Sequence, residues 1–177
     1  GKLVADGKIP IGLGGEHAIT PLIVEAFIAT YHRFGVVQFD AHADLRDEYE
    51  GDRHSHACAA RRILDLGLPL LQIGVRSMSK EEHDFRRNAD VSFIDAETIA
   101  ERGFRVDDIP ADFPEEIYVS LDLDVLDPSI IPATGTPEPG GLDWYAMKSI
   151  FNVIAESRTI VGLDVVELAP IDGFHAA

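Results

Sequence analysis

Three alternating polar residues in the first half of the chain could bind a metal ion. Asp40, His42 and Asp44 follow an apolar stretch at residues 34–39 that is typical of a buried strand. Residues two apart in an extended chain point to the same side, so these side chains can converge on one point. Carboxylates at the end of a buried strand are costly to desolvate unless a positive charge meets them. The segment therefore predicts a metal site, the alternative being a simple turn.

A second segment of this kind lies further along the chain. Asp122 and Asp124 follow the apolar residues 117–121 and form the pair that we assign to metal binding, whereas Asp127 precedes Pro128 and is expected to open a turn. The four carboxylates of the two segments balance two divalent cations. Carboxylate and imidazole ligands without a thiolate favour Mn²⁺ over a structural zinc site, and Fe²⁺, Co²⁺ and Ni²⁺ remain alternatives.

Three further polar residues follow other predicted strands, and two histidines lie in the loop after the first metal-binding segment. His17 can supply an imidazole to one metal, or be only a capping residue. His54 and His56 are candidates for proton transfer because imidazole titrates near neutral pH, or else both are exposed loop residues. Asp164 and Glu167 lie at the end of the last predicted strand. One interpretation is that they are ordinary strand-end acids. The other is that a glutamate beside two metals binds a planar cation such as guanidinium.

Apolar runs alternate with helix-like segments along the chain. The predicted strands are residues 9–13, 34–39, 70–75, 91–94, 117–121 and 159–165, and the predicted helices are residues 19–30, 57–66, 80–88, 96–102 and 143–157. Asp143 is the expected N-cap of the last helix. Nearly continuous apolar strands are typical of a parallel sheet covered on both faces. We therefore predict an α/β fold, a three-layer α/β/α sandwich around a mainly parallel sheet.

All the candidate residues follow the carboxyl ends of these strands. Such ends meet at one edge of a parallel sheet, where ligands bind in this class of fold. A Pro- and Gly-rich segment at residues 128–141 is predicted to be a loop at the same edge. The shared position of several separate segments is a stronger indication of a site than any one of them.

The composition argues against several other classes of protein. The chain has 177 residues, with 31 acidic against 15 basic residues and a formal net charge of −16, and phosphate contacts to nucleic acid need Lys and Arg. A negative field favours cationic small molecules and metals. No apolar stretch approaches the length of a membrane span and no signal pattern is present, so we expect a cytoplasmic protein. The single cysteine, Cys58, fits a reducing cytosol and is expected to be a buried packing residue.

Four blocks of the sequence together resemble the ureohydrolase family of arginases and agmatinases. The blocks are residues 14–17, residues 40–44 with 55–56, residues 120–137 and residues 162–170, which span nearly the whole chain in the family's order. The resemblance implies an arginase-like sandwich and a hydrolase of linear amidines. Family members extend beyond both ends of this chain, so we expect residues 1–177 to be a single ureohydrolase domain, a fragment without N- and C-terminal parts.

The resemblance also implies a binuclear site with two Mn²⁺ per chain. One metal would take His17, Asp40, Asp44 and Asp122, and the other would take Asp40, His42, Asp122 and Asp124. Asp40 and Asp122 would then bridge the two metals. A hydroxide shared by the metals would attack the guanidinium carbon.

The catalytic residues implied by the resemblance are Asp124, His56 and Glu167. Asp124 would relay a proton to the leaving amine, His56 would shuttle protons to solvent, and Glu167 would hold the guanidinium group. The products would be urea and an amine. The family also suggests a homo-oligomer, either a trimer or a hexamer.

The expected substrate is agmatine, which would yield putrescine for polyamine biosynthesis. The loop at residues 47–56 is rich in acids, which would repel the α-carboxylate of arginine and tolerate a cationic amine tail. The alternatives are an arginase or another guanidino-acid hydrolase on the same site, a single-zinc deacetylase-like enzyme, and an inactive assembly subunit.

Overall fold

A parallel sheet forms the centre of the protein in the computed structural model, which describes residues 1–89 and 91–170. The strands are β1 (Ile11–Leu13), β2 (Gly35–Phe39), β3 (Leu70–Ile73), β4 (Val91–Ile94), β5 (Glu116–Asp122) and β6 (Thr159–Val166). Their order in the sheet is β1-β6-β5-β2-β3-β4, and every neighbouring pair is parallel. The predicted parallel sheet is therefore confirmed.

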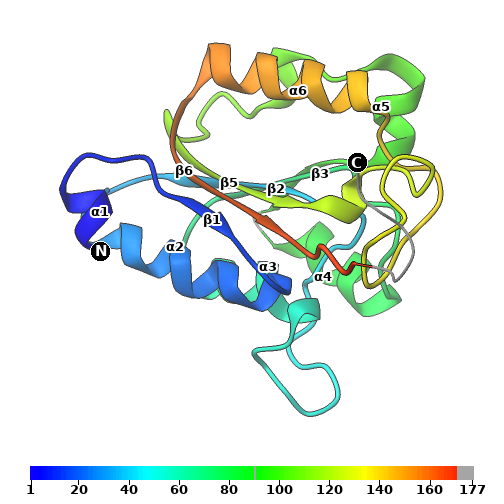
Figure 1. Ribbon diagram of the computed structural model, residues 1–177, viewed down its shortest axis with the longest axis horizontal. Helices are drawn as coiled ribbons and strands as arrows, with labels where there is room; N and C mark the ends of the chain where they lie inside the picture. Colours follow the sequence, from blue (N-terminus) through cyan, green and yellow to red (C-terminus); the bar gives the residue numbers. More distant parts are fainter. Residues whose placement is uncertain (90, 171–177) are drawn as a thin grey trace.

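Helices cover both faces of the sheet (Figure 1). One face carries α1 (Lys2–Ala5), α2 (Thr20–Ile28), α3 (Ala59–Asp65) and α4 (Lys80–Asn88), and the other carries α5 (Ala96–Arg102) and α6 (Trp144–Ser157). On the first face Phe27 of α2 belongs to the same buried cluster as Val36 of β2. On the second face Ile99 and Ile150 share a cluster with Phe39. Because β2 contributes to both clusters, the three-layer prediction is confirmed.

The ends of the elements differ from the sequence-based bounds at a few places. The strand predicted at residues 70–75 ends at Ile73, because the next residue, Gly74, takes a φ of +94° and leaves the extended conformation. Glycine is needed at this position, since a Cβ would lie 2.6 Å from the side chain of Val125. The helices predicted at residues 19–30 and 57–66 are each preceded by a 3₁₀ turn, η1 (His17–Ile19) and η2 (His56–Cys58). Two further 3₁₀ turns are η3 (Val106–Asp108) and η4 (Leu123–Val125).

The N-cap predicted for the last helix is confirmed. The carboxylate of Asp143 accepts a hydrogen bond of 2.7 Å from the main-chain nitrogen of Ala146, at the start of α6. This satisfies one of the amide groups that the first turn of a helix leaves without a partner. In the described residues, no helix has both the length and the apolar character needed to cross a membrane.

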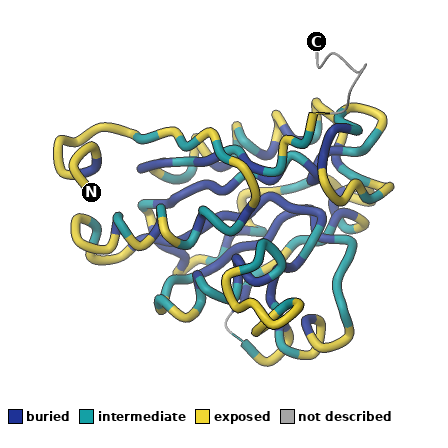
Figure 2. Tube along the Cα trace, turned by 60° about the horizontal axis from the view of Figure 1, so that its bottom comes forward, coloured by how far each residue is buried: buried dark blue, intermediate teal, exposed yellow. Residues whose placement is uncertain are grey.

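The register of the sheet brings the two acidic segments together. Phe39 of β2 pairs with Leu121 of β5. Asp40, which follows β2, and Asp122, the last residue of β5, therefore lie side by side at the same edge of the sheet. The central strands β2, β3 and β5 are buried almost throughout, and the tube coloured by burial shows dark blue segments inside the molecule and largely exposed connecting loops (Figure 2). The candidate residues therefore lie where buried strands end and solvent-accessible loops begin.

Candidate metal centre

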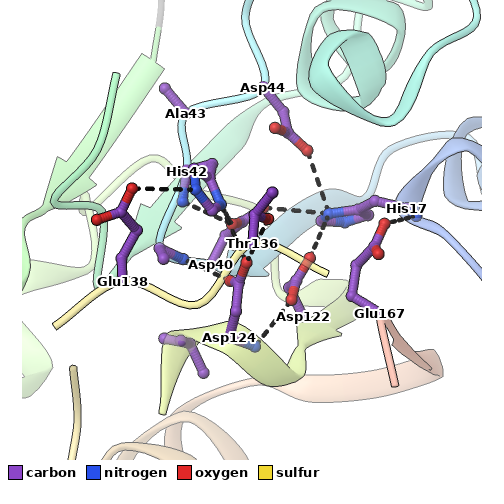
Figure 3. A network of polar contacts seen from close by, with 12 residues as sticks. His17, Asp40, His42, Ala43, Asp44, Asp122, Asp124, Thr136, Glu138 and Glu167 are labelled. Atoms are coloured by element: carbon purple, nitrogen blue, oxygen red, sulfur yellow. Dashed lines mark hydrogen bonds and ion pairs between the residues drawn. The ribbon is translucent and has the colours of Figure 1, made fainter. Parts of the chain in front are cut away.

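The imidazole of His17 lies buried among three carboxylates (Figure 3). Its Nδ1 atom is 3.1 Å from Asp40, 3.2 Å from Asp44 and 3.3 Å from Asp122. Although these oxygens surround it, Nδ1 has no hydrogen-bond partner of acceptable geometry in the described structure. A buried nitrogen facing three acids without a hydrogen bond is an arrangement that a bound cation would satisfy.

A second histidine forms a neighbouring group with two of the acids. His42 Nδ1 lies 3.0 Å from Asp124 Oδ2 and 3.5 Å from Asp40 Oδ1. The ligand atoms of His17, Asp40 and Asp44 all lie within 4.8 Å of one another, and so do those of Asp40, His42 and Asp124. Asp40 thus belongs to both groups, which is the position expected of a bridging ligand.

Asp122, the other predicted bridge, belongs to neither of these groups. One of its oxygens faces His17, and the other accepts a hydrogen bond of 2.9 Å from the main-chain nitrogen of Asp124. The structure therefore brings together all six predicted ligands, with Asp122 at the margin. Their roles as ligands remain predictions.

Main-chain geometry holds the acids in place. Asp40 accepts hydrogen bonds from the Gln38 side chain at 2.7 Å and from the His42 amide at 2.6 Å. The Ala41 amide donates to Asp124 at 3.0 Å, which ties the two acidic segments together. Asp44 takes a φ of +52°, a left-handed conformation that is uncommon for a residue other than glycine. A strained backbone at a buried acid is typical of a functional site.

The charges of this cluster are poorly balanced in the protein alone. Among the described residues, no Lys or Arg side chain forms an ion pair with the four acids Asp40, Asp44, Asp122 and Asp124. Their ion-pair partners are the imidazoles of His17 and His42. Two divalent cations would balance four carboxylates, and oxygen and imidazole donors suit such ions. The residues present therefore fit the predicted metals.

The pKa values of the cluster show the same imbalance. Burial, followed by the negative charge of Asp40, raises the pKa of Asp44 to about 7, and the same two causes raise the pKa of Asp122 well above its ordinary range. Burial opposes the charged form of His42, yet hydrogen bonds to Asp124 and Asp40 raise its pKa to about 11. Without metals, the cluster therefore retains protons that bound cations would have to displace.

A cavity of about 300 Å³ opens beside both groups. Its wall includes His42, Asp44, Asp122, Thr136 and Glu167. Glu167 follows β6 with a φ of +64°, and one of its carboxylate oxygens accepts a hydrogen bond of 2.6 Å from the His17 amide. This contact fixes the carboxylate beside the candidate ligands, and the figure shows Glu167 beside His17 and Asp122 (Figure 3).

The two candidate histidines of the following loop lie in different places. His56 lines the cavity, and its Nδ1 is 3.2 Å from a carboxylate oxygen of Glu16. His54 is exposed and lines a separate groove. The structure therefore brings His56, but not His54, to the cavity beside the candidate ligands.

The comparison with known proteins decides the family. A family model described as the arginase family matches residues 1–176 of this chain. The chain belongs to the arginase family.

Relatives of this arginase-family chain are found among both curated proteins and solved structures. N(1)-aminopropylagmatine ureohydrolase of Synechocystis sp. is 41% identical over 172 residues, covering 96% of this chain and 56% of that protein. The agmatine ureohydrolase structure of Thermoplasma volcanium matches with a TM-score of 0.80 and 39% identity, covering 96% of this chain and 57% of that one. Arginase from Bacillus caldovelox matches with a TM-score of 0.82 and 27% identity, covering 96% and 64%. The chain thus spans between 56% and 60% of the length of three curated relatives.

The acidic side chains of the loop at residues 47–56 do not line the cavity of this arginase-family chain. Asp47 forms an ion pair of 2.8 Å with Arg62 on the outer surface, and the other acids of the loop are also exposed. The residues of this loop that line the cavity are Tyr49 and His56. These acids therefore act on a substrate only through their charge at a distance, and their predicted repulsion of an α-carboxylate stays a prediction.

Sequence reasoning missed Arg76, which holds the loop at the edge of the cluster. Its half-buried guanidinium donates to main-chain carbonyls of Asp124 at 2.7 Å, Glu138 at 2.8 Å and Pro139 at 3.1 Å, and more weakly to others nearby. Asp124 is a predicted ligand, and Glu138 lies 3.9 Å from His42. A lone arginine after a strand gives no sequence signal for this role, because its partners are carbonyl groups.

Replacing Arg76 is expected to weaken one metal group selectively. Arg76→Lys keeps the charge but cannot reach as many carbonyls, so Asp124 becomes less well fixed. We expect Mn²⁺ affinity at the group of Asp40, His42 and Asp124 to fall about 10- to 100-fold, the usual effect of losing a group that orients a ligand. Calorimetric Mn²⁺ titration measures this, with the exposed Arg87→Lys as the matched control; equal affinity in both variants would contradict it.

Metal affinity is expected to rise with pH. Metal binding must displace the proton of Asp44, whose pKa is about 7, and the protons of the two imidazoles, whose pKa values are raised. Below pH 7 the apparent Mn²⁺ affinity at the group of His17, Asp40 and Asp44 should therefore increase at least about tenfold per pH unit. Above pH 7 the affinity should increase more gradually, because Asp44 no longer carries a proton. Mn²⁺ titrations at pH 6, 7 and 8 check this, and an affinity independent of pH would be inconsistent with it.

Proposed function

We propose that the protein is a metal-dependent amidinohydrolase that cleaves a guanidino amine, with agmatine as the first candidate, to urea and an amine. The observation that carries the proposal is the pair of ligand groups sharing the buried Asp40, beside a cavity that also holds Glu167. Membership of the arginase family agrees with this chemistry.

Manganese is the proposed metal because the ligand groups combine carboxylates with imidazoles and contain no thiolate. When bound, two such cations supply a water molecule acidic enough to act as a nucleophile near neutral pH. The chain itself contributes fixed positions for the ligands, since Asp40 and Asp124 are each held by main-chain amide groups.

Glu167, Asp124 and His56 are the residues that we propose act on the substrate. One oxygen of Glu167 is held by the His17 amide, which leaves the other free to accept hydrogen bonds from a guanidinium group. Asp124 can pass a proton to the leaving amine. His56, partly exposed at the cavity wall and paired with Glu16, can exchange protons with solvent.

An amine tail fits the cavity better than the α-carboxylate of arginine. Among the described residues of the wall, Arg46 is the one Lys or Arg side chain, and it already lies 3.6 Å from the carboxylate of Glu82 and over the ring of Tyr49. An α-carboxylate would therefore find no unpaired cation. The name of the Synechocystis relative makes N(1)-aminopropylagmatine the second candidate, since it also carries a cationic tail.

The test is urea release by the purified protein loaded with Mn²⁺. Agmatine, N(1)-aminopropylagmatine and arginine are compared at equal concentrations, with chelator-treated protein as the control. We expect urea from one or both amines at a kcat/KM well above that for arginine. A preference for arginine would overturn the substrate assignment, and no urea from any of the three would overturn the proposed activity.

A further inference from the structure

A buried acid that the proposed mechanism does not use lies behind His17. Asp164 of β6 is fully buried and accepts hydrogen bonds from Ser120 at 2.7 Å, Tyr118 at 2.7 Å and Thr20 at 2.9 Å. No Lys, Arg or His of the described residues forms an ion pair with it. Burying a carboxylate among hydroxyl groups alone is costly compared with an apolar residue, so its presence calls for a physical reason.

The sheet register places this acid directly beside the chain of contacts to the metal cluster. Ser120 of β5 and Asp164 of β6 are partners in the parallel ladder. On the other side of Ser120, its hydroxyl oxygen lies 2.9 Å from Nε2 of His17. Asp164, Ser120 and His17 therefore form one continuous buried line that ends at the nitrogen facing the three carboxylates.

The number of protons along this line fixes the state of the imidazole. An ionised carboxylate only accepts hydrogen bonds, so the Ser120 hydroxyl gives its one proton to Asp164. Ser120 can then only accept from His17, which requires the imidazole to carry its proton on Nε2. When a metal displaces any proton on the other nitrogen, the lone pair of the ring is therefore on Nδ1, the atom that lies among Asp40, Asp44 and Asp122.

We propose that Asp164, acting through Ser120, is a positioning residue that holds His17 in the tautomer able to bind a metal through Nδ1. The inference rests on the proposed metal-dependent function. It goes further by assigning a role to an acid that touches neither substrate nor metal. A ligand histidine whose other nitrogen is held in this way binds metal more tightly, because ring orientation and tautomer are fixed in advance.

The hydrogen bonds of Asp164 provide a matched pair of variants. Ser120→Ala cuts the line to His17 while leaving Asp164 its bonds from Tyr118 and Thr20. Tyr118→Phe removes one bond to the same carboxylate but leaves the line intact. Asp164→Asn keeps the size of the side chain, yet its amide can donate to Ser120, which frees the hydroxyl to donate to His17 and favours the wrong tautomer.

The experiment is Mn²⁺ titration of the metal-free protein by calorimetry, with electron paramagnetic resonance reporting whether two Mn²⁺ ions are coupled. We expect Ser120→Ala and Asp164→Asn to lose about 10- to 100-fold in affinity at the group containing His17 and to show uncoupled Mn²⁺ at intermediate loading. The group of Asp40, His42 and Asp124 should keep its affinity, and Tyr118→Phe should behave as the unaltered protein does.

The possible outcomes separate this inference from the proposed function. Wild-type affinity at both groups in Ser120→Ala would overturn the inference, even if Asp164→Asn does not fold. An equal loss in Tyr118→Phe would also overturn it, since the effect would then come from packing. If the unaltered protein itself fails to bind two metals, the proposed function fails, and the inference fails with it.

Discussion

Asp40→Asn is expected to abolish binding of both metals and with it urea release. Asp40 is the residue shared by the two ligand groups, and it is fully buried against both histidines. Asparagine keeps the shape but removes the charge that would bridge two cations. Because metal ions supply several kcal/mol of transition-state stabilisation, we expect kcat to fall at least about 1000-fold. Metal content by mass spectrometry and urea release by a colorimetric assay check the two effects together.

The control for Asp40→Asn is the same chemical change on the surface. Asp84 on α4 is exposed, and among the described residues its carboxylate contacts His83 alone, so Asp84→Asn should keep both metals and full activity. Full activity in Asp40→Asn would sink the two-metal account. Cooperative thermal unfolding of each variant shows that the chain still folds.

Glu167→Gln is expected to lower kcat/KM about 10- to 150-fold while both metals stay bound. Glutamine can still accept the hydrogen bond from the His17 amide, so the side chain keeps its place. It cannot, however, offer a charged acceptor to a guanidinium group, and a hydrogen bond to a charged group contributes about 1.5–3 kcal/mol. Steady-state kinetics with agmatine and metal content by mass spectrometry provide the measurement.

Retention of metal distinguishes Glu167→Gln from Asp40→Asn. Glu97 is exposed on α5, so Glu97→Gln provides the matched control and should leave kcat/KM unchanged. If Glu167→Gln turned over agmatine as fast as the control, the proposed role of Glu167 in substrate binding would be wrong. If it lost its metals, the glutamate would act on the metal cluster instead.

The sequence predicted the position of the cluster better than its local geometry. We expected Asp40 and Asp44 to converge because residues two apart in an extended chain share a side. The strand instead ends at Phe39, and Asp44 reaches the cluster through a left-handed conformation at φ +52°. Asp122 is the last residue of β5 and caps the short turn η4, so Asp124 reaches the cluster from a turn rather than from an extended strand. The alternating pattern thus identified the right residues, although the backbone brings them together differently.

Contacts that depend on strand register could not be predicted from one sequence. The buried strands were clear because parallel strands covered on both faces are apolar almost throughout. The hydrogen bond between Ser120 and Asp164 depends on which residues of β5 and β6 lie side by side, and apolar strands do not specify this. The ion pair of Asp47 with Arg62, which holds one acid of the loop at residues 47–56 on the outer surface, likewise joins residues that the sequence pattern does not bring together.

The most direct test of the central claim is to locate the metals in crystals of the protein grown with Mn²⁺, using anomalous scattering at the manganese edge. The account predicts two peaks about 3.5 Å apart, one bound by His17, Asp40 and Asp44 and the other by Asp40, His42 and Asp124. A single peak would contradict the binuclear site and favour the single-metal alternative. No peak at these residues would contradict the metal centre itself.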